Sequence, residues 1–392
     1  MPTAYLVAAA RTPLGSFGGS LASLTAVHLG AHAARAALER SGLDPAAVDA
    51  ALLGNVCSAG LGQAPARQVA LAAGLPESLP CTTVNKVCSS GMKAIALAAQ
   101  AVELGHAEVV LAGGFESMSN VPFYVPKARF GYTFGGGELL DGLQHDGLRD
   151  AYDEVAMGVA ADQTAAAEGI TRADQDDYTV RSYRRAAASA DDGRLGAEIA
   201  PVALPQRRGD DLVVDRDEEI ARVRFEKIPT LRPVFTPDGT VTAANASPIS
   251  DGAAAVLVVS ERALATHGLT PLARVAAYAD AACAPMRFPL APTLAAPIAL
   301  ERAGVAVGDV AVAEVNEAFA SVPIAFQRAL ELDPGRVNPN GGAVSLGHPL
   351  GTSGARIVGS LAHELSLAGG RYGLAAICNG GGGASAMVLE RA

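Results

Sequence analysis

Several kinds of residue are scarce or absent in this chain of 392 residues. It has no tryptophan, and only 5% of its residues are aromatic and 18% are charged. Because half of the residues are hydrophobic, the chain can bury a large core and is not disordered. The 43 glycines indicate tight backbone packing and many turns, and they argue against an aromatic-lined recognition surface.

Positive charge is also in deficit, since the formal net charge is −10. Binding to nucleic acid needs clustered cations, so we expect no nucleic-acid partner. The sequence lacks a run of about 18 uncharged apolar residues, so we expect no membrane span. The apolar start, residues 1–10, has no basic region before it and predicts a first strand, not a signal peptide.

The cysteines form no recognisable disulfide pattern. There are five of them, Cys57, Cys81, Cys88, Cys283 and Cys378, and none belongs to a C-x-x-C pair. An odd number fits no disulfide framework and favours a reducing, cytoplasmic location. In that setting a free cysteine is usually a small buried hydrophobic residue, so a reactive one needs further evidence.

An internal repeat is the most informative feature of the sequence. Residues 37–43, ALERSGL, recur as residues 299–305, ALERAGV. In both copies an apolar strand precedes the match, and a helix opening on Ser-Gly and a strand ending in glycines follow it. This order predicts an α/β fold with two similar halves, residues 1–120 and 271–392, packed as a pseudo-dimer. The equivalent elements are predicted as a first strand at 5–10 and 274–279, a helix at 90–104 and 353–365, and a later strand at 109–114 and 374–383.

The sequence between the halves has a different character. Residues 121–250 contain a charged stretch at 141–230 with Gly/Pro punctuation and a helical segment at 174–190. We expect an inserted loop domain that carries binding loops or oligomer contacts. Its acidic run, residues 215–219, predicts a solvated face. The chain then returns to the N-terminal core near residues 241–270, through the buried-strand pattern at 253–259.

One cysteine lies where a strand is predicted to give way to a helix. Cys88 follows the apolar segment ending at Val87 and precedes Ser89 and Ser90, which are good helix-starting residues. The positive end of a helix stabilises a thiolate, so this position predicts a lowered thiol pKa and a nucleophile. A buried cysteine in a strand–helix turn fits the same local pattern.

Three other segments have residues suited to acyl chemistry. Cys378 is followed by Asn379 and four glycines, whose exposed N–H groups could bind an oxyanion or could simply form a tight turn. His348 precedes a predicted helix and could act as a general base. Asn316 ends an apolar strand, where it is either a functional donor or a strand cap.

Taken together, these segments resemble the thiolase family over essentially the whole chain. The matching motifs, all in the order found in the family, are NKVCSSG at 85–91, TAANAS at 242–247, NEAF at 316–319, GHPLG at 347–351 and CNGGGG at 378–383. The resemblance implies a thiolase-like duplicated five-layer αβαβα architecture. Within the family it is strongest to the acetyl-CoA acetyltransferases, which convert two acetyl-CoA to acetoacetyl-CoA and CoA, reversibly.

The resemblance also implies a role for each reactive residue. Cys88 would become acetylated after His348 takes its proton, and the N–H groups of Cys88 and Gly380 would bind the oxyanion. Cys378 would remove an α-proton from the second acetyl-CoA. A water held by Asn316 would stabilise the enolate together with His348.

Further residues follow from the same resemblance. CoA is expected as substrate, with no resident cofactor, and with possible activation by K⁺. Residues 123–142 match the segment that joins dimers into a homotetramer. The residues expected near CoA or the acyl group are Leu148, Met157, Tyr183, Arg222, Arg224, Lys227, Phe235, Ser247, Ala318 and Phe319. Those expected near K⁺ are Tyr183, Ala243, Ala244, Ala246 and Val344.

Two positions depart from the family pattern, and three other functions compete. Ala156 stands where the family usually has histidine, and Ser250 where it usually has asparagine. The alternatives are a broader-range 3-ketoacyl-CoA thiolase of β-oxidation, a decarboxylating condensing enzyme and an inactive CoA-binding scaffold. Condensing enzymes of the decarboxylating type lack a second cysteine, so Cys378 counts against them.

Overall fold

The computed structural model describes residues 2–392, and its centre is a set of ten hydrogen-bonded strands. The N-terminal part has the order β4-β3-β5-β10-β1 and the C-terminal part β12-β13-β14-β11, while the short β2 (Gly15–Ser16) pairs with β10. The two parts meet where β1 pairs with β11, through only Tyr5 with Arg274 and Leu6 with Ala273. The strand bounds are β1 Ala4–Arg11, β3 Ala50–Gly54, β4 Cys81–Val84, β5 Val109–Ser117, β10 Ser250–Ser260, β11 Ala273–Ala282, β12 Val310–Val315, β13 Tyr372–Asn379 and β14 Gly383–Arg391.

The repeated sequence forms the same structure twice. Helices α1 (Ala26–Ser41) and α8 (Ala291–Ala303) end at Gly42 and Gly304, which have φ of 67° and 66°. This left-handed conformation is the helix ending that glycine favours. Each helix is followed by one 3₁₀ turn and by an equivalent strand, β3 or β12. The strand orders β3-β5-β10-β1 and β12-β13-β14-β11 also correspond, so the fold is duplicated.

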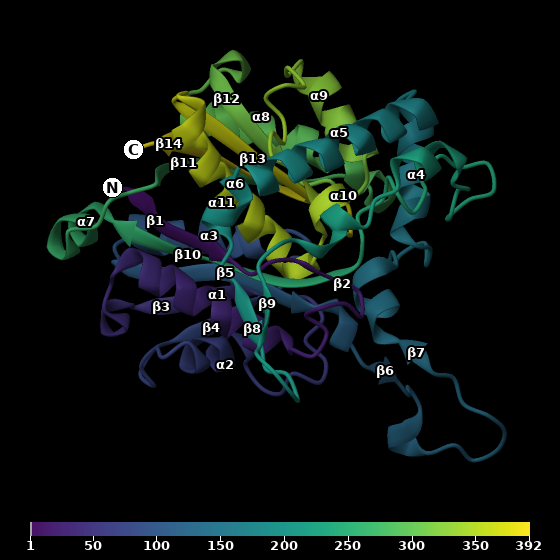
Figure 1. Ribbon diagram of the computed structural model, residues 1–392, viewed down its shortest axis with the longest axis horizontal. Coiled ribbons are helices and arrows are strands. Elements are labelled where there is room, and N and C mark those ends of the chain that lie inside the picture. The colour runs from purple at the N-terminus through teal and green to yellow at the C-terminus, as the bar shows by residue number, and fades with distance from the viewer. Residues whose placement is uncertain (1) are drawn as a thin grey trace.

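Helices on and between the sheets complete five layers (Figure 1). Helices α1 and α2 (Pro65–Ala72) cover the outer face of the N-terminal sheet, and α8 and α9 (Ser321–Leu330) pack on the C-terminal side. Helices α3 (Ser90–Glu103) and α11 (Leu350–Ala368) lie between the sheets and pack on each other. The middle layer is buried on all sides, which explains why both of its helices are largely apolar.

Glycines let α3 and α11 approach very closely. A Cβ on Gly91 would lie 2.7 Å from the nitrogen of Ala355, and one on Gly354 would lie 2.5 Å from the nitrogen of Met92. Such distances are too short for any side chain, so both positions require glycine. The crossing brings the beginnings of the two helices together, and these beginnings carry Cys88 and His348.

The segment between β5 and β10 lies outside the layers. It forms the β6/β7 hairpin, which extends away from the body, and helices that pack over the C-terminal half (Figure 1). A second hairpin, β8/β9, lies beside the N-terminal half. The elements are β6 Phe123–Tyr124, β7 Leu140–Asp141, α4 Met157–Ala167, α5 Arg172–Asp191, α6 Arg194–Glu198, β8 Val202–Leu204 and β9 Leu212–Val214; α7 Glu261–His267 and α10 Ala343–Leu346 lie later in the chain.

Three local expectations were wrong. Helix α11 begins at Leu350, three residues before the predicted start, because residues 350–352 add one turn. Strand β13 ends at Asn379, since the glycines that follow form a turn into β14. The acidic run is not a solvated face, because Asp217 is buried and its Oδ1 lies 2.6 Å from Nη1 of Arg11. A buried arginine needs such a partner.

Candidate active site

The turn that carries Cys88 is strained and tightly braced. Val87 has a φ of 48°, a left-handed conformation that β-branched residues rarely adopt. The Ser90 hydroxyl accepts from the Lys86 N–H at 2.8 Å and donates to the Val87 carbonyl at 2.6 Å. Lys86 Nζ lies 2.7 Å from Asp280 in the C-terminal half. These bonds fix Cys88 directly before α3.

The glycine-rich turn after β13 faces Cys88. The backbone N–H groups of Gly380 and of Cys88 itself lie close enough to the Cys88 thiol to lower its pKa. Ser89 does not cap its own helix as expected, because its hydroxyl donates to Asn379 Oδ1 at 3.0 Å. The first half therefore supplies the thiol, and the second half supplies one of two N–H donors for an oxyanion.

Burial, not the helix terminus, controls the thiol pKa values, so the prediction of a lowered value was wrong. Burial raises the pKa of Cys88 to about 12, although the two N–H donors lower it. The pKa of Cys378 is also raised, first by burial and then by the charge of Cys88, which places the two sulfur groups within electrostatic reach. A thiol in such surroundings needs a base to release its proton.

His348 is uncharged, as a side chain that is to accept the thiol proton must be. The Ser353 hydroxyl donates to the Pro349 carbonyl at 3.0 Å and lies 2.7 Å from Nδ1 of His348, so its oxygen accepts a hydrogen bond from the Nδ1–H group. Nε2 then carries the free lone pair, and within residues 2–392 it has no hydrogen-bond partner. Burial lowers the pKa of His348 to about 3, and the charge of Arg356 acts in the same direction. The imidazole is therefore neutral at neutral pH.

The backbone of His348 is held by a residue that departs from the family pattern. The Ser250 hydroxyl accepts from the His348 N–H at 3.2 Å and donates to the Pro248 carbonyl at 3.0 Å. A Cβ on Gly347 would come within 2.5 Å of this hydroxyl. Ser250 thus holds the backbone of the turn that carries His348.

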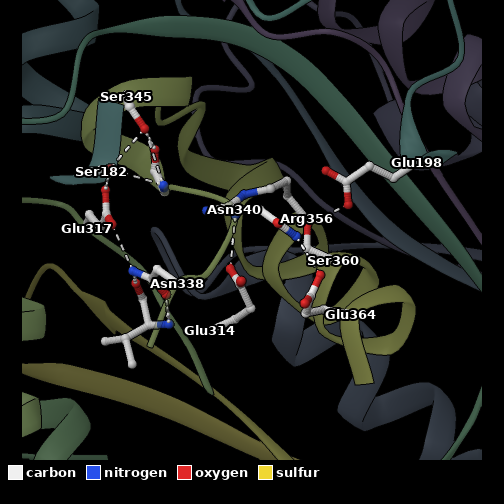
Figure 2. Close-up of polar contacts among 12 residues, drawn as sticks. Ser182, Glu198, Glu314, Glu317, Asn338, Asn340, Ser345, Arg356, Ser360 and Glu364 are labelled. Carbon is white, nitrogen blue, oxygen red and sulfur yellow. Dashed lines mark hydrogen bonds and ion pairs between the residues drawn. The ribbon is translucent and has the colours of Figure 1, made fainter. Parts of the chain in front are cut away.

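Asn316 is fully buried at the end of β12, and neither of its side-chain polar atoms has a partner among the described residues. Leaving an amide unpaired costs about 1–3 kcal/mol per group, which points to a bound molecule at this position. The neighbouring carboxylate is fully paired: Figure 2 shows Glu317 between Ser182 and Asn338, with distances of 2.8 Å to each. This network anchors α5 beside the site.

One cavity of about 610 Å³ is lined by Cys88, His348 and Gly380. Most of the residues predicted from sequence line it: Cys88, Leu148, Met157, Phe235, Ala243, Ala246, Ser247, Ala318, Phe319, His348 and Gly380. Asn316 and Cys378 are completely buried and are not part of the lining. The cavity brings groups from both halves and from the inserted segment to one place.

Several predicted residues lie elsewhere. Arg222, Arg224 and Lys227 are exposed on the 3₁₀ turns of the inserted segment, and none of them lines the cavity. Tyr183 is buried on α5, with its ring centroid 6.4 Å from that of Phe225. Ala244 and Val344 are also outside the lining.

Sequence reasoning did not identify several residues of the site. Ser353, which orients His348, lies five residues after it, and only its place in the repeated Ser-Gly pair could have marked it. The remaining wall residues gave no signal, because apolar and loop residues of this kind are common. They are Gln144, Gly147, Arg149, Glu154, Gly158, Val234, Pro248, Ile249 and Phe288, whereas Leu350 belongs to the GHPLG segment and Ala156 is a departure noted above.

Comparison with protein families identifies the class of this fold and site. Models of the thiolase N-terminal domain and the thiolase C-terminal domain match residues 4–262 and 269–391. The chain belongs to the thiolase family. Among the described residues no helix is long and apolar enough to cross a membrane, and no group of three His, Cys, Asp or Glu side chains could hold a metal ion.

Individual relatives are similar over their full lengths. The acetyl-CoA acetyltransferase of Schizosaccharomyces pombe is 51% identical over 388 residues, covering 99% of this chain and 98% of that protein. The mitochondrial acetyl-CoA acetyltransferase of Bos taurus is 52% identical over 387 residues, covering 98% and 91%. The crystal structure of Acat5 thiolase from Ascaris suum in complex with coenzyme A has a TM-score of 0.94 and 45% identity, covering 100% of both chains.

Proposed function

We propose that this protein is an acetyl-CoA C-acetyltransferase, which joins two acetyl-CoA molecules through an acetyl-cysteine intermediate and also catalyses the reverse reaction. The observation that carries the proposal is the single cavity lined by Cys88, His348 and Gly380, with Cys378 and Asn316 buried beside it. Full-length relatives with the name acetyl-CoA acetyltransferase support the choice of substrate.

In the first half-reaction Cys88 attacks the thioester carbonyl of acetyl-CoA. Nε2 of His348 takes the thiol proton, and the N–H groups of Cys88 and Gly380 stabilise the tetrahedral oxyanion. The carbon–sulfur bond to CoA then breaks. The departing CoA thiolate needs a proton, and the Cys378 thiol is the buried acid that can give it.

In the second half-reaction the Cys378 thiolate removes an α-proton from another acetyl-CoA. Asn316, through a water molecule, and His348 hydrogen-bond the thioester oxygen while the enolate forms. The carbanion attacks the acetyl carbon on Cys88, and the Cys88 thiolate leaves and regains its proton from His348. Both cysteines and the histidine return to their starting states, and the products are acetoacetyl-CoA and CoA.

The inserted segment is proposed to bind the rest of CoA. Leu148, Met157, Phe235 and Ser247 line the cavity, together with Ala318 and Phe319. The exposed cations Arg222, Arg224 and Lys227 would meet the phosphates of the nucleotide, because phosphate binding needs only a few local charges.

A K⁺ site is proposed beside α5. Its residues are those expected near K⁺ from the resemblance, namely Tyr183, Ala243, Ala244, Ala246 and Val344. Burial and the negative charges of Glu219 and Glu317 raise the pKa of the Tyr183 phenol. The same negative potential favours a monovalent cation at the neighbouring backbone oxygens. Bound there, K⁺ would hold α5 and the 243–246 loop in place.

The proposed assembly is a homotetramer joined through the β6/β7 hairpin. Phe130 is 92% exposed and Phe134 is completely exposed, which is unusual for aromatic side chains on a free surface. Substituting both with Asp should give dimers in light scattering, whereas unchanged tetramers would exclude this contact.

A cytoplasmic location is proposed from the unpaired cysteines, and relatives exist in cytosolic and mitochondrial forms.

A direct assay tests the catalytic proposal. Purified protein should release CoA from acetyl-CoA, gain one acetyl group on Cys88 by mass spectrometry, and cleave acetoacetyl-CoA faster than longer 3-ketoacyl-CoA substrates. Preference for the longer substrates would favour the broader-range thiolase instead. Absence of both CoA release and acetylation would support an inactive scaffold.

A further inference from the structure

A buried carboxylate that takes no part in the reaction lies behind the two helix starts. Glu116 is near the end of β5 and is 0% exposed. Its Oε1 accepts from Asn55 Nδ2 at 3.0 Å and from the Cys57 N–H at 3.1 Å. Its Oε2 accepts from the Val56 N–H at 3.0 Å and from the Gly351 N–H at 2.8 Å. All four partners are donors, which favours the ionised carboxylate, while burial acts in the opposite direction and raises the pKa of Glu116 to about 7.

One of these four bonds, from the Gly351 N–H, joins the two halves of the molecule. Three of the donors belong to the loop after β3 in the N-terminal half, while Gly351 lies in the first turn of α11, three residues after His348. The residue at the start of that helix, Pro349, makes no side-chain cap. The carboxylate therefore satisfies a helix N–H that its own segment leaves free.

The fit around Gly351 is tight. A Cβ at this position would lie 2.8 Å from Oε2 of Glu116 and 3.1 Å from the Gly54 carbonyl oxygen. The glycine in the GHPLG segment is therefore explained by the approach of Glu116. Any change in this contact must move the beginning of α11, and with it the turn that holds His348.

The internal repeat supports the same reading. Leu53 pairs with Gly113 and Val315 with Ala376, so the register of the duplicated strands makes Glu116 the counterpart of Asn379. Asn379 accepts from Ser89 at the start of α3, in the opposite half. The end of each half's central strand thus holds the start of the other half's helix.

We propose that Glu116 is a positioning residue, which fixes the turn bearing His348 against the N-terminal half. It acts through Gly351 and does not touch the substrate. The proposal rests on the proposed acetyl transfer, because that reaction gives His348 its role. Loss of the carboxylate should disturb the chemical steps much more than CoA binding.

Kinetics and hydrogen exchange test this role together. Glu116→Gln keeps the length of the side chain and removes its charge. We expect kcat for acetoacetyl-CoA cleavage to fall by about 10- to 100-fold while KM changes by less than about threefold. Amide exchange in residues 348–353 should become about tenfold faster. Gly351→Ala should give the same pattern, and the double variant should be no slower than the slower single variant.

A second buried carboxylate provides the control. Glu198 is paired with Arg11 at 2.7 Å and does not line the cavity. It also accepts from the Ser360 hydroxyl at 2.6 Å (Figure 2). Glu198→Gln should lower the melting temperature but leave kcat and exchange at 348–353 unchanged. Unchanged kcat in Glu116→Gln, or equal effects in the control, would overturn the proposal. If the wild-type protein transfers no acetyl group, the proposed function fails, while exchange at 348–353 still decides whether Glu116 holds this turn.

Discussion

The starts of α3 and α11 are counterparts in the duplicated fold, but they carry different chemistry. Pairing Ser90-Gly91 with Ser353-Gly354 makes Gly351 the counterpart of Cys88. Cys88 faces the Gly380 N–H and an open cavity. Gly351 faces a carboxylate that fills the equivalent space. One junction is thus the proposed reaction centre, and the other is the proposed structural support.

The difference between the junctions also explains the placement of the base. Helix α11 starts three residues earlier than α3 in the repeat register, and this extra turn carries the chain back to His348. Ser90 and Ser353 therefore have different roles. Ser90 stabilises the strained turn at Val87, whereas Ser353 orients the imidazole of His348. Duplication supplied two similar helix starts, and divergence made them complementary.

The largest expected effect is the loss of the thiol at the first junction. Cys88→Ala removes the only group that can hold the acetyl intermediate, so kcat should fall by about 10⁴-fold or more. Mass spectrometry after incubation with acetyl-CoA should find no acetylated protein. Acetylation at the wild-type rate would place the nucleophile elsewhere.

Removing the second thiol should separate the two half-reactions. Cys378→Ala lacks the proposed base but keeps Cys88 and its oxyanion donors, so acetyl-enzyme should still form. Condensation should be slower by about 10³-fold, within the range for a lost general base. Production of acetoacetyl-CoA at the wild-type rate would refute the assignment of Cys378.

The base at the second junction should matter for both catalysis and acid stability. His348→Asn should lower kcat by about 10²- to 10³-fold. Since the folded-state pKa of His348, about 3, is below its ordinary value, the unfolded chain binds the proton first as pH falls. Stability is therefore lost between about pH 6.5 and 3, at up to about 1.4 kcal/mol per pH unit from this group. Urea unfolding at several pH values should show a shallower loss in His348→Asn; an identical slope would contradict the lowered pKa.

The smallest effects should distinguish the two equivalent serines. Ser353→Ala leaves Nδ1 of His348 without its partner, so kcat should fall by about tenfold. Ser90→Ala leaves the Lys86 N–H unpaired at the strained turn, so it should cost about 1–3 kcal/mol of unfolding free energy. Denaturant midpoints and kcat measured on both variants check this contrast. Equal changes in kcat and in denaturant midpoint for the two variants would show that the junctions have not diverged as described.

Much of this arrangement could be predicted from sequence because it is encoded locally. The repeat at 37–43 and 299–305, the α/β alternation and the five motifs indicated the duplicated fold and the residues with reactive groups. Glu116 could not be recognised in this way, because its partners at 55–57 and at Gly351 are far apart in the chain. The pKa of Cys88 was predicted with the wrong sign for a similar reason: the helix start is local, but burial depends on the whole fold.

The sequence by itself determined which chemical groups exist and which segments repeat, since residue type and periodicity are properties of the chain. Only the tertiary structure decided that Cys88 and His348 face one cavity, that Asn316 remains unpaired beside it, and that a carboxylate closes the counterpart junction. These relations depend on how closely α3 and α11 cross. That distance is set by packing between layers, which local sequence does not specify.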